Sequence, residues 1–97
     1  MQIVFTHRDD GPERLLAEAE LHFGDDAGPL AGLKLVGFCL WRGADGVARV
    51  TVPARAYTSG DERRFFDLVR AQDGSGESVK ALKAHILEAH KEAKSSS

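Results

Sequence analysis

The strongest pattern in this sequence is the C-terminal segment "SVKALKAHILEAHKEAK" (residues 78–94), whose apolar side chains recur at helical spacing. Ser75 or Ser78 is available as an N-cap for this helix. Lysines with Leu87 among them form a second face of the helix, and glutamates form a third. Because a single apolar stripe has to be buried, the rest of the chain must supply a layer for the helix to pack on. The stripe is Val79, Leu82, Ile86, Ala89 and Ala93.

The preceding chain predicts antiparallel strands. Ile3 and Phe5 alternate with polar residues near the N-terminus, as in a short strand. Residues 33–41, "LKLVGFCLW", are apolar on both faces, as suits a central strand or one buried in a dimer. The loop "RGADG" then leads to a partner strand, "VARVTV" (residues 47–52). Pro53 ends that strand, because proline cannot donate to a ladder.

Two segments are ambiguous in sequence. Residues 13–23, "ERLLAEAELHF", favour helix by propensity, yet their apolar and polar residues alternate with a period of two. We interpret this segment as a strand, with helix as the alternative. Residues 63–71, "RRFFDLVRA", fit either a strand or a short helix, and residues 72–78 resemble a flexible linker.

The length of 97 residues predicts one domain, residues 1–94, with residues 95–97 as a disordered tail. The fold class we expect is α+β, a small antiparallel sheet with a C-terminal amphipathic helix. A short chain leaves much apolar surface uncovered, which favours a homodimer. The expected dimer interface lies on the two-sided strand and comprises Leu35, Val36, Phe38, Leu40 and Trp41.

Several classes of protein are disfavoured. The sequence has no phosphate-binding loop or nucleophile motif, so we expect no enzyme, and no cofactor. His85 and His90 are five residues apart and point away from each other, so we expect solvent-exposed or rim histidines and no metal site. Cys39, the only cysteine, lies in a strand as a small hydrophobic residue. The absence of a signal peptide and of a long apolar run predicts a cytoplasmic protein outside the membrane.

Charge is unevenly distributed, although the net charge is only −2. Residues 1–30 are acidic, and the remainder is mildly basic. The basic and aromatic positions of that remainder form a candidate nucleic-acid site, in which Tyr57 could stack on bases. The alternative is that these cations keep the protein soluble and block edge pairing. The candidate residues are Arg49, Arg55, Tyr57, Arg63, Arg64, Lys80, Lys83 and Lys91.

The order of these elements resembles the stage V sporulation protein G family. Val52-Pro53 matches the family's strand end, Arg55 its first basic position, Ser59-Gly60 its turn, and residues 65–68 its following strand. The resemblance implies a dimeric, non-enzymatic bacterial regulator that binds DNA or RNA, largely through phosphates. Ala56 stands where the family usually has a second basic residue. The alternative is therefore a dimeric protein-interaction module without nucleic-acid binding.

Overall fold

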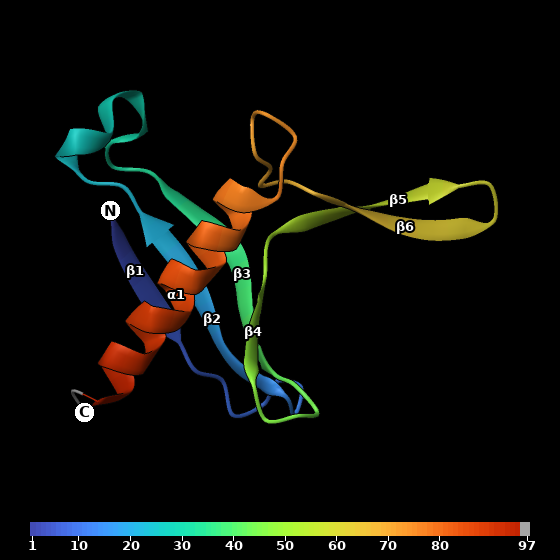
Figure 1. Ribbon diagram of the computed structural model, residues 1–97, viewed down its shortest axis with the longest axis horizontal. Coiled ribbons are helices and arrows are strands. Elements are labelled where there is room, and N and C mark those ends of the chain that lie inside the picture. Colours follow the sequence, from blue (N-terminus) through green and yellow to red (C-terminus); the bar gives the residue numbers. More distant parts are fainter. Residues whose placement is uncertain (96–97) are drawn as a thin grey trace.

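The computed structural model describes residues 1–95 and confirms the α+β class, with antiparallel strands and a C-terminal helix (Figure 1). Four strands form the main sheet in the order β1-β2-β3-β4. They are β1 (Gln2–Thr6), β2 (Leu15–His22), β3 (Lys34–Arg42) and β4 (Ala48–Thr51). A 3-10 segment, η1 (Asp25–Leu30), joins β2 to β3. The segment 13–23 therefore contains a strand over residues 15–22, as its alternation indicated, and the helical alternative is wrong.

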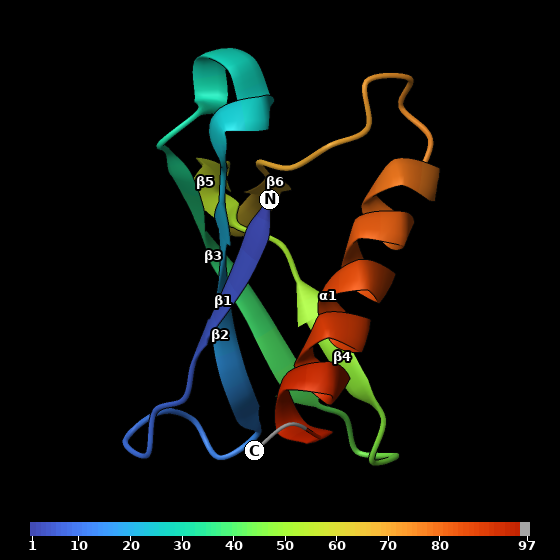
Figure 2. The same ribbon diagram turned by 90° about the vertical axis from the view of Figure 1, so that its left-hand side faces the viewer.

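The helix α1 (Glu77–Ser95) crosses one face of the main sheet and leaves the other face uncovered (Figure 2). The alternation of β2 places Ala17, Ala19 and Leu21 in the buried layer. Phe38 and Leu40 of β3 lie beside them, and both are fully buried. The core therefore lies between the sheet and α1, as the amphipathic pattern predicted.

The buried stripe of α1 differs in part from the predicted one. Ile86 is fully buried at its centre, as expected. Leu87 also packs on the core, although it was expected on the lysine face, whereas Ala93 is exposed. From Val79 to His90 the buried and half-buried residues on this side follow one another at alternating spacings of three and one, which keeps them on one side of a helix with 3.6 residues per turn. The predicted stripe instead moves to the flank of the helix at Ala89 and Ala93.

The start of α1 follows Gly76, whose carbonyl accepts a hydrogen bond from the Lys80 backbone N–H at 3.0 Å. Gly76 therefore stands at the N-cap position, and neither Ser75 nor Ser78 does. The hydroxyl of Ser75, one residue earlier, accepts from the Glu77 backbone N–H at 3.4 Å. The helix includes Ser95, one residue beyond the predicted domain end. The rest of the predicted tail, residues 96–97, lies outside the described residues.

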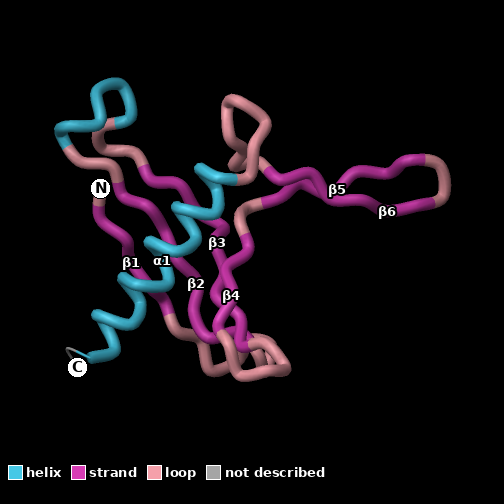
Figure 3. Tube along the Cα trace, viewed as in Figure 1, coloured by secondary structure: helices cyan, strands magenta, loops and turns pink. Residues whose placement is uncertain are grey.

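The last two strands leave the main sheet as a separate hairpin, which we call the arm (residues 54–67; Figure 3). It consists of β5 (Ala54–Ser59) and β6 (Glu62–Asp67), so residues 63–67 resolve as a strand. The turn is Gly60-Asp61, one residue later than the Ser59-Gly60 turn that the resemblance implied, because Ser59 still pairs with Glu62. Gly60 has φ 64°, which suits the first central position of a type II′ turn. Every residue of both arm strands is exposed.

The arm is attached to the sheet at Pro53. The carbonyl of Pro53 accepts a hydrogen bond from the Leu68 backbone N–H at 2.9 Å, which closes the root of the arm. Pro53 also packs against Gly37 of β3, where a Cβ would lie 2.9 Å from the proline Cβ. Gly37 has φ 104° and lies at an irregularity in the β2–β3 pairing. A side chain at position 37 would therefore push the root of the arm away from β3.

Candidate nucleic-acid interface on the arm

The pairing of β5 with β6 sorts the candidate residues onto two faces. The pairs Arg55–Phe66 and Tyr57–Arg64 lie on one face, which we call the Tyr57 face. The pairs Ala56–Phe65 and Thr58–Arg63 lie on the other, which we call the Phe65 face. Arg55 and Arg64 therefore act on the same side of the arm, whereas Arg63 points to the opposite side. The three arginines do not form a single cluster.

The Tyr57 face combines exposed rings with cations. Tyr57 is 43% exposed and Phe66 46% exposed, and Arg55 joins them around a shallow hollow of about 240 Å³. Arg64 pairs with Glu62 at 2.9 Å, while Arg55 has no ion pair among the described residues. Exposed ion pairs of this kind contribute little to stability, so Arg64 can exchange its partner for a phosphate.

Phe66 and Arg70 were not among the predicted site residues. The Arg70 guanidinium carbon lies 4.6 Å from the centroid of the Phe66 ring, within cation–π range. The sequence signal for Phe66 was present, because centring the hairpin on Gly60-Asp61 places position 66 opposite Arg55. Arg70 lies beyond β6, where no strand register extends to it. Its position therefore required the structure.

The Phe65 face is less basic. Arg63 lies 5.7 Å over the Phe65 ring, and Asp67 offsets its charge. Where this face meets the sheet, Phe65 borders an open groove of about 580 Å³ together with Trp41 and Lys83. The groove is a concave surface with few charges, unlike the Tyr57 face.

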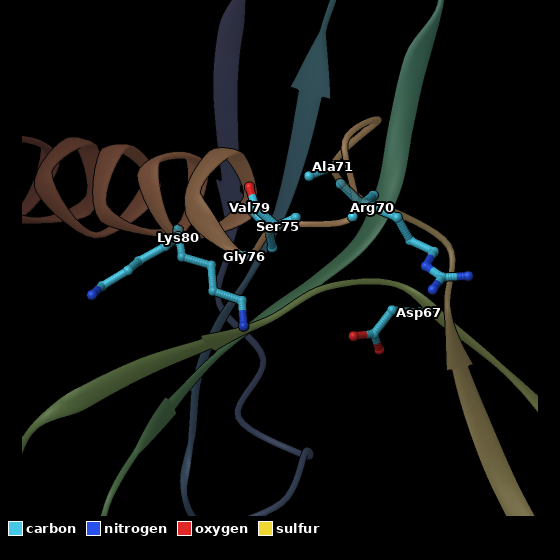
Figure 4. Close-up of a pocket in the computed structure, with 10 residues that line it drawn as sticks. Asp67, Arg70, Ala71, Ser75, Gly76, Val79 and Lys80 are labelled. Carbon is cyan, nitrogen blue, oxygen red and sulfur yellow. The ribbon is translucent and has the colours of Figure 1, made fainter.

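The root of the arm adjoins the start of α1 around a pocket of about 330 Å³. Figure 4 shows Asp67 and Arg70 from the arm side and Lys80 from the helix bordering this pocket, which Lys83 also lines. Two of the three predicted helix lysines thus lie beside the arm. Lys91 lies about 16 Å from Lys80 along the helix axis, at 1.5 Å per residue. It lies on the same helical stripe but apart from the arm.

Arg49 is also separate from the arm. It lies on β4 near the 43–47 turn and pairs with Asp45 at 3.0 Å. The backbone N–H of Val47 donates to the same carboxylate, and this bond, with the nearby Arg49 charge, lowers the pKa of Asp45. Arg49 therefore contributes to the structure of the 43–47 turn through its ion pair with Asp45.

The residues predicted for the dimer interface divide between core and surface. Phe38 and Leu40 are fully buried inside the monomer, so they are not available to a partner. Leu35 is half-buried and packs against the same core. Val36 is 48% exposed, and Trp41 is half-buried with its indole N–H donating to Thr51 Oγ1 at 2.9 Å. The apolar residues on one face of β3 are explained by α1, which packs on that face and buries it.

His90 departs from the predicted exposure of the histidines. It is only 7% exposed, and its Nε2 atom has no hydrogen-bond partner among the described residues. Its ring meets Phe5 edge-on at 5.1 Å and lies 5.7 Å from the ring of His7. His85 is exposed, as expected, because the five-residue spacing turns it away. Within residues 1–95 no group of three or more potential ligands is placed to hold a metal ion.

Cys39 and the helix bear on two further expectations. Burial raises the pKa of the Cys39 thiol, and the nearby Glu18 charge raises it further, so the reactive thiolate is disfavoured. In the described part of the chain no helix is long and apolar enough to cross a membrane.

Comparison with protein-family models, with curated proteins and with solved structures finds no match to this chain.

Proposed function

We propose that this protein is a non-enzymatic, dimeric nucleic-acid-binding regulator that contacts DNA or RNA largely through phosphates. The observation that carries the proposal is the Tyr57 face, where Arg55, Arg64 and Arg70 surround two exposed rings. Lys80 and Lys83 extend the positive charge from the root of the arm onto α1. The resemblance to the stage V sporulation protein G family supports the same function and a cytoplasmic location.

The charge distribution supports a local rather than a global polyanion site. The protein is slightly acidic overall, so the cations must be concentrated where the ligand binds. On the Tyr57 face and at the adjoining root, three arginines stand against Glu62 and Asp67, and Lys80 and Lys83 add to the positive charge at the root. Of the acidic residues in the N-terminal third, Glu18 and Glu20 lie on β2 of the main sheet, away from the arm. A phosphate backbone would therefore follow the arm and the beginning of α1.

A second copy of this chain is the partner that we propose for the uncovered sheet face. Val36 is exposed near the start of β3, and Trp41 is half-buried near its end. The radius of gyration is 14.9 Å, whereas a compact chain of this length has about 12.5 Å. Because the extended shape leaves much apolar surface without cover, association with a second copy would bury it.

Salt dependence tests the proposed function. Anisotropy of a labelled single strand and of a labelled duplex is measured between about 50 mM and 200 mM salt. The double variant Arg55→Ala/Arg64→Ala should weaken binding to all sequences about equally. It should reduce the single-strand salt slope by about 0.7 for each phosphate that the variant no longer neutralises.

The matched control is Arg8→Ala, because Arg8 is also an exposed arginine with an ion pair, to Glu18 at 3.2 Å, but lies outside the arm. This variant should keep the wild-type slope. If the wild type binds neither ligand at low salt, the proposal fails. The dimeric protein-interaction module without nucleic-acid binding would then be the better description.

A further inference from the structure

We propose that the Tyr57 face is a stacking platform for single-stranded nucleic acid, on which Tyr57 and Phe66 each take one base. This inference rests on the proposed function and narrows its ligand to unpaired strands. Arg55, Arg64 and Arg70 would lie beside the phosphates that flank those two bases. The residues belong to two strands and the segment after them, and only the hairpin register brings them together.

The register fixes the pattern of the platform. Arg55 is opposite Phe66, and Tyr57 is opposite Arg64, so rings and cations alternate both along and across the strands. The two rings therefore stand on a diagonal of the hairpin, where positions are about 7–8 Å apart. Bases stacked in a duplex follow each other at about 3.4 Å. Two rings at the diagonal spacing therefore suit neighbouring bases that have separated from each other.

The rings are also accessible from the solvent side. Nearly half of each ring residue's surface is exposed, and both rings border the same hollow beside Arg55. A base in a duplex is covered above and below by its neighbours, so its flat side cannot reach such a ring. The platform therefore discriminates by strand state and tolerates any base, because every base has a flat π-surface.

Arg70 contributes a preformed part of the site. Its guanidinium already lies over the Phe66 ring at 4.6 Å, and it can cover only one side of that ring. The guanidinium plane can itself stack on a neighbouring base. The positive charge of Arg70 above the Phe66 ring also favours a polyanionic ligand over an uncharged aromatic one.

The first test removes the rings and keeps the charges. Tyr57→Leu/Phe66→Leu should weaken binding to a labelled single strand at least fivefold for each ring. Duplex binding should change by less than about twofold, because its phosphate contacts are intact. The salt slope should also be unchanged, since every cation is retained. The matched control is Phe65→Leu, which removes an even more exposed ring, at 67%, from the opposite face and should leave both affinities unchanged.

The second measurement detects stacking directly. The chain has one tryptophan and one tyrosine, so Trp41→Phe/Tyr57→Trp places a single indole on the arm. Base stacking should quench its fluorescence with a single strand, whereas heparin, a polyanion without bases, should not. A far-UV spectrum and a thermal melt like those of the wild type establish that each variant is folded.

The outcomes separate this inference from the proposed function. If the wild type binds both ligands and the ring variant keeps the wild-type affinities, stacking is wrong while phosphate binding stands. An equal weakening by Phe65→Leu would move the contact to the other face and overturn the inference. If heparin quenches as strongly as the oligonucleotide, the indole senses charge rather than bases. If no nucleic acid binds at all, both proposals fail.

Discussion

At the scale of single residues, Gly37 determines where the arm leaves the sheet. Its backbone has φ 104°, which side-chain-bearing residues rarely adopt, and Pro53 occupies the space where a Cβ would stand. These two effects can be separated, because Gly46 has φ 81° with no atom within 4 Å of its Cβ position. An alanine at position 46 therefore incurs the cost of the positive φ without a steric clash.

We expect Gly37→Ala to lower the free energy of unfolding by more than Gly46→Ala does. Gly46→Ala should cost about 1–2 kcal/mol, the usual cost of a left-handed backbone for a residue with a side chain. Gly37→Ala should add a steric cost and weaken nucleic-acid binding, because the displaced Pro53 carries the arm with it. Urea titration of both variants measures the difference. Equal destabilisation would mean that the Gly37–Pro53 contact relaxes at no cost.

At the scale of elements, the sequence predicted the strands of the main sheet, the pairing of β3 with β4 and the helix, whereas β6 stayed ambiguous. The alternation in residues 15–22 and the helical spacing around Ile86 are local signals, and both were sufficient. The arm's face assignment needed the pairing register, which follows from the turn at Gly60-Asp61. That Phe38 is core and Val36 is surface was not predictable, since a regular strand would place both on one face and the irregularity at Gly37 in the β2–β3 pairing separates them.

The docking of α1 on the sheet should depend on pH through His90. The pKa of His90 lies below its ordinary value of 6.5 mainly because burial disfavours the charged ring; the nearby His7 and Lys94 lower it further. His7 faces it from beyond the end of β1, with the two ring centroids 5.7 Å apart. The unfolded chain thus takes up a proton at a pH where the folded chain does not. Stability is therefore full above pH 6.5 and falls as the pH drops from there towards the pKa of the folded state.

Thermal melts at about pH 7.5 and 5.5 should show a lower melting temperature at the acidic value. His90→Leu should reduce this difference, whereas His85→Gln, an exposed change on the same helix, should retain it. The carboxylates with lowered pKa, on Glu20, Asp45 and Asp73, titrate below 4.5 and so outside this range. An undiminished difference in His90→Leu would contradict the assignment to His90.

At the scale of the whole molecule, the proposed dimer predicts a mass of twice 10.5 kDa by light scattering at micromolar concentration. Val36→Asp should give a folded monomer, because a charge on the exposed face would be buried without a partner on association. Phe38→Asp should unfold the chain, since that side chain is fully buried within one copy. A wild-type mass of 10.5 kDa would refute the dimer, and an unfolded Val36→Asp would place Val36 in the core.

The separation of the arm from the core affects how the protein can evolve. The Pro53–Leu68 hydrogen bond closes the root of the arm, and Pro53 contacts Gly37 of the sheet, while Phe38, Leu40 and Ile86 pack elsewhere. Changes in the arm's length, charge or aromatic content therefore leave the core's packing unchanged. Selection can vary ligand preference there without compensating substitutions in the sheet or the helix.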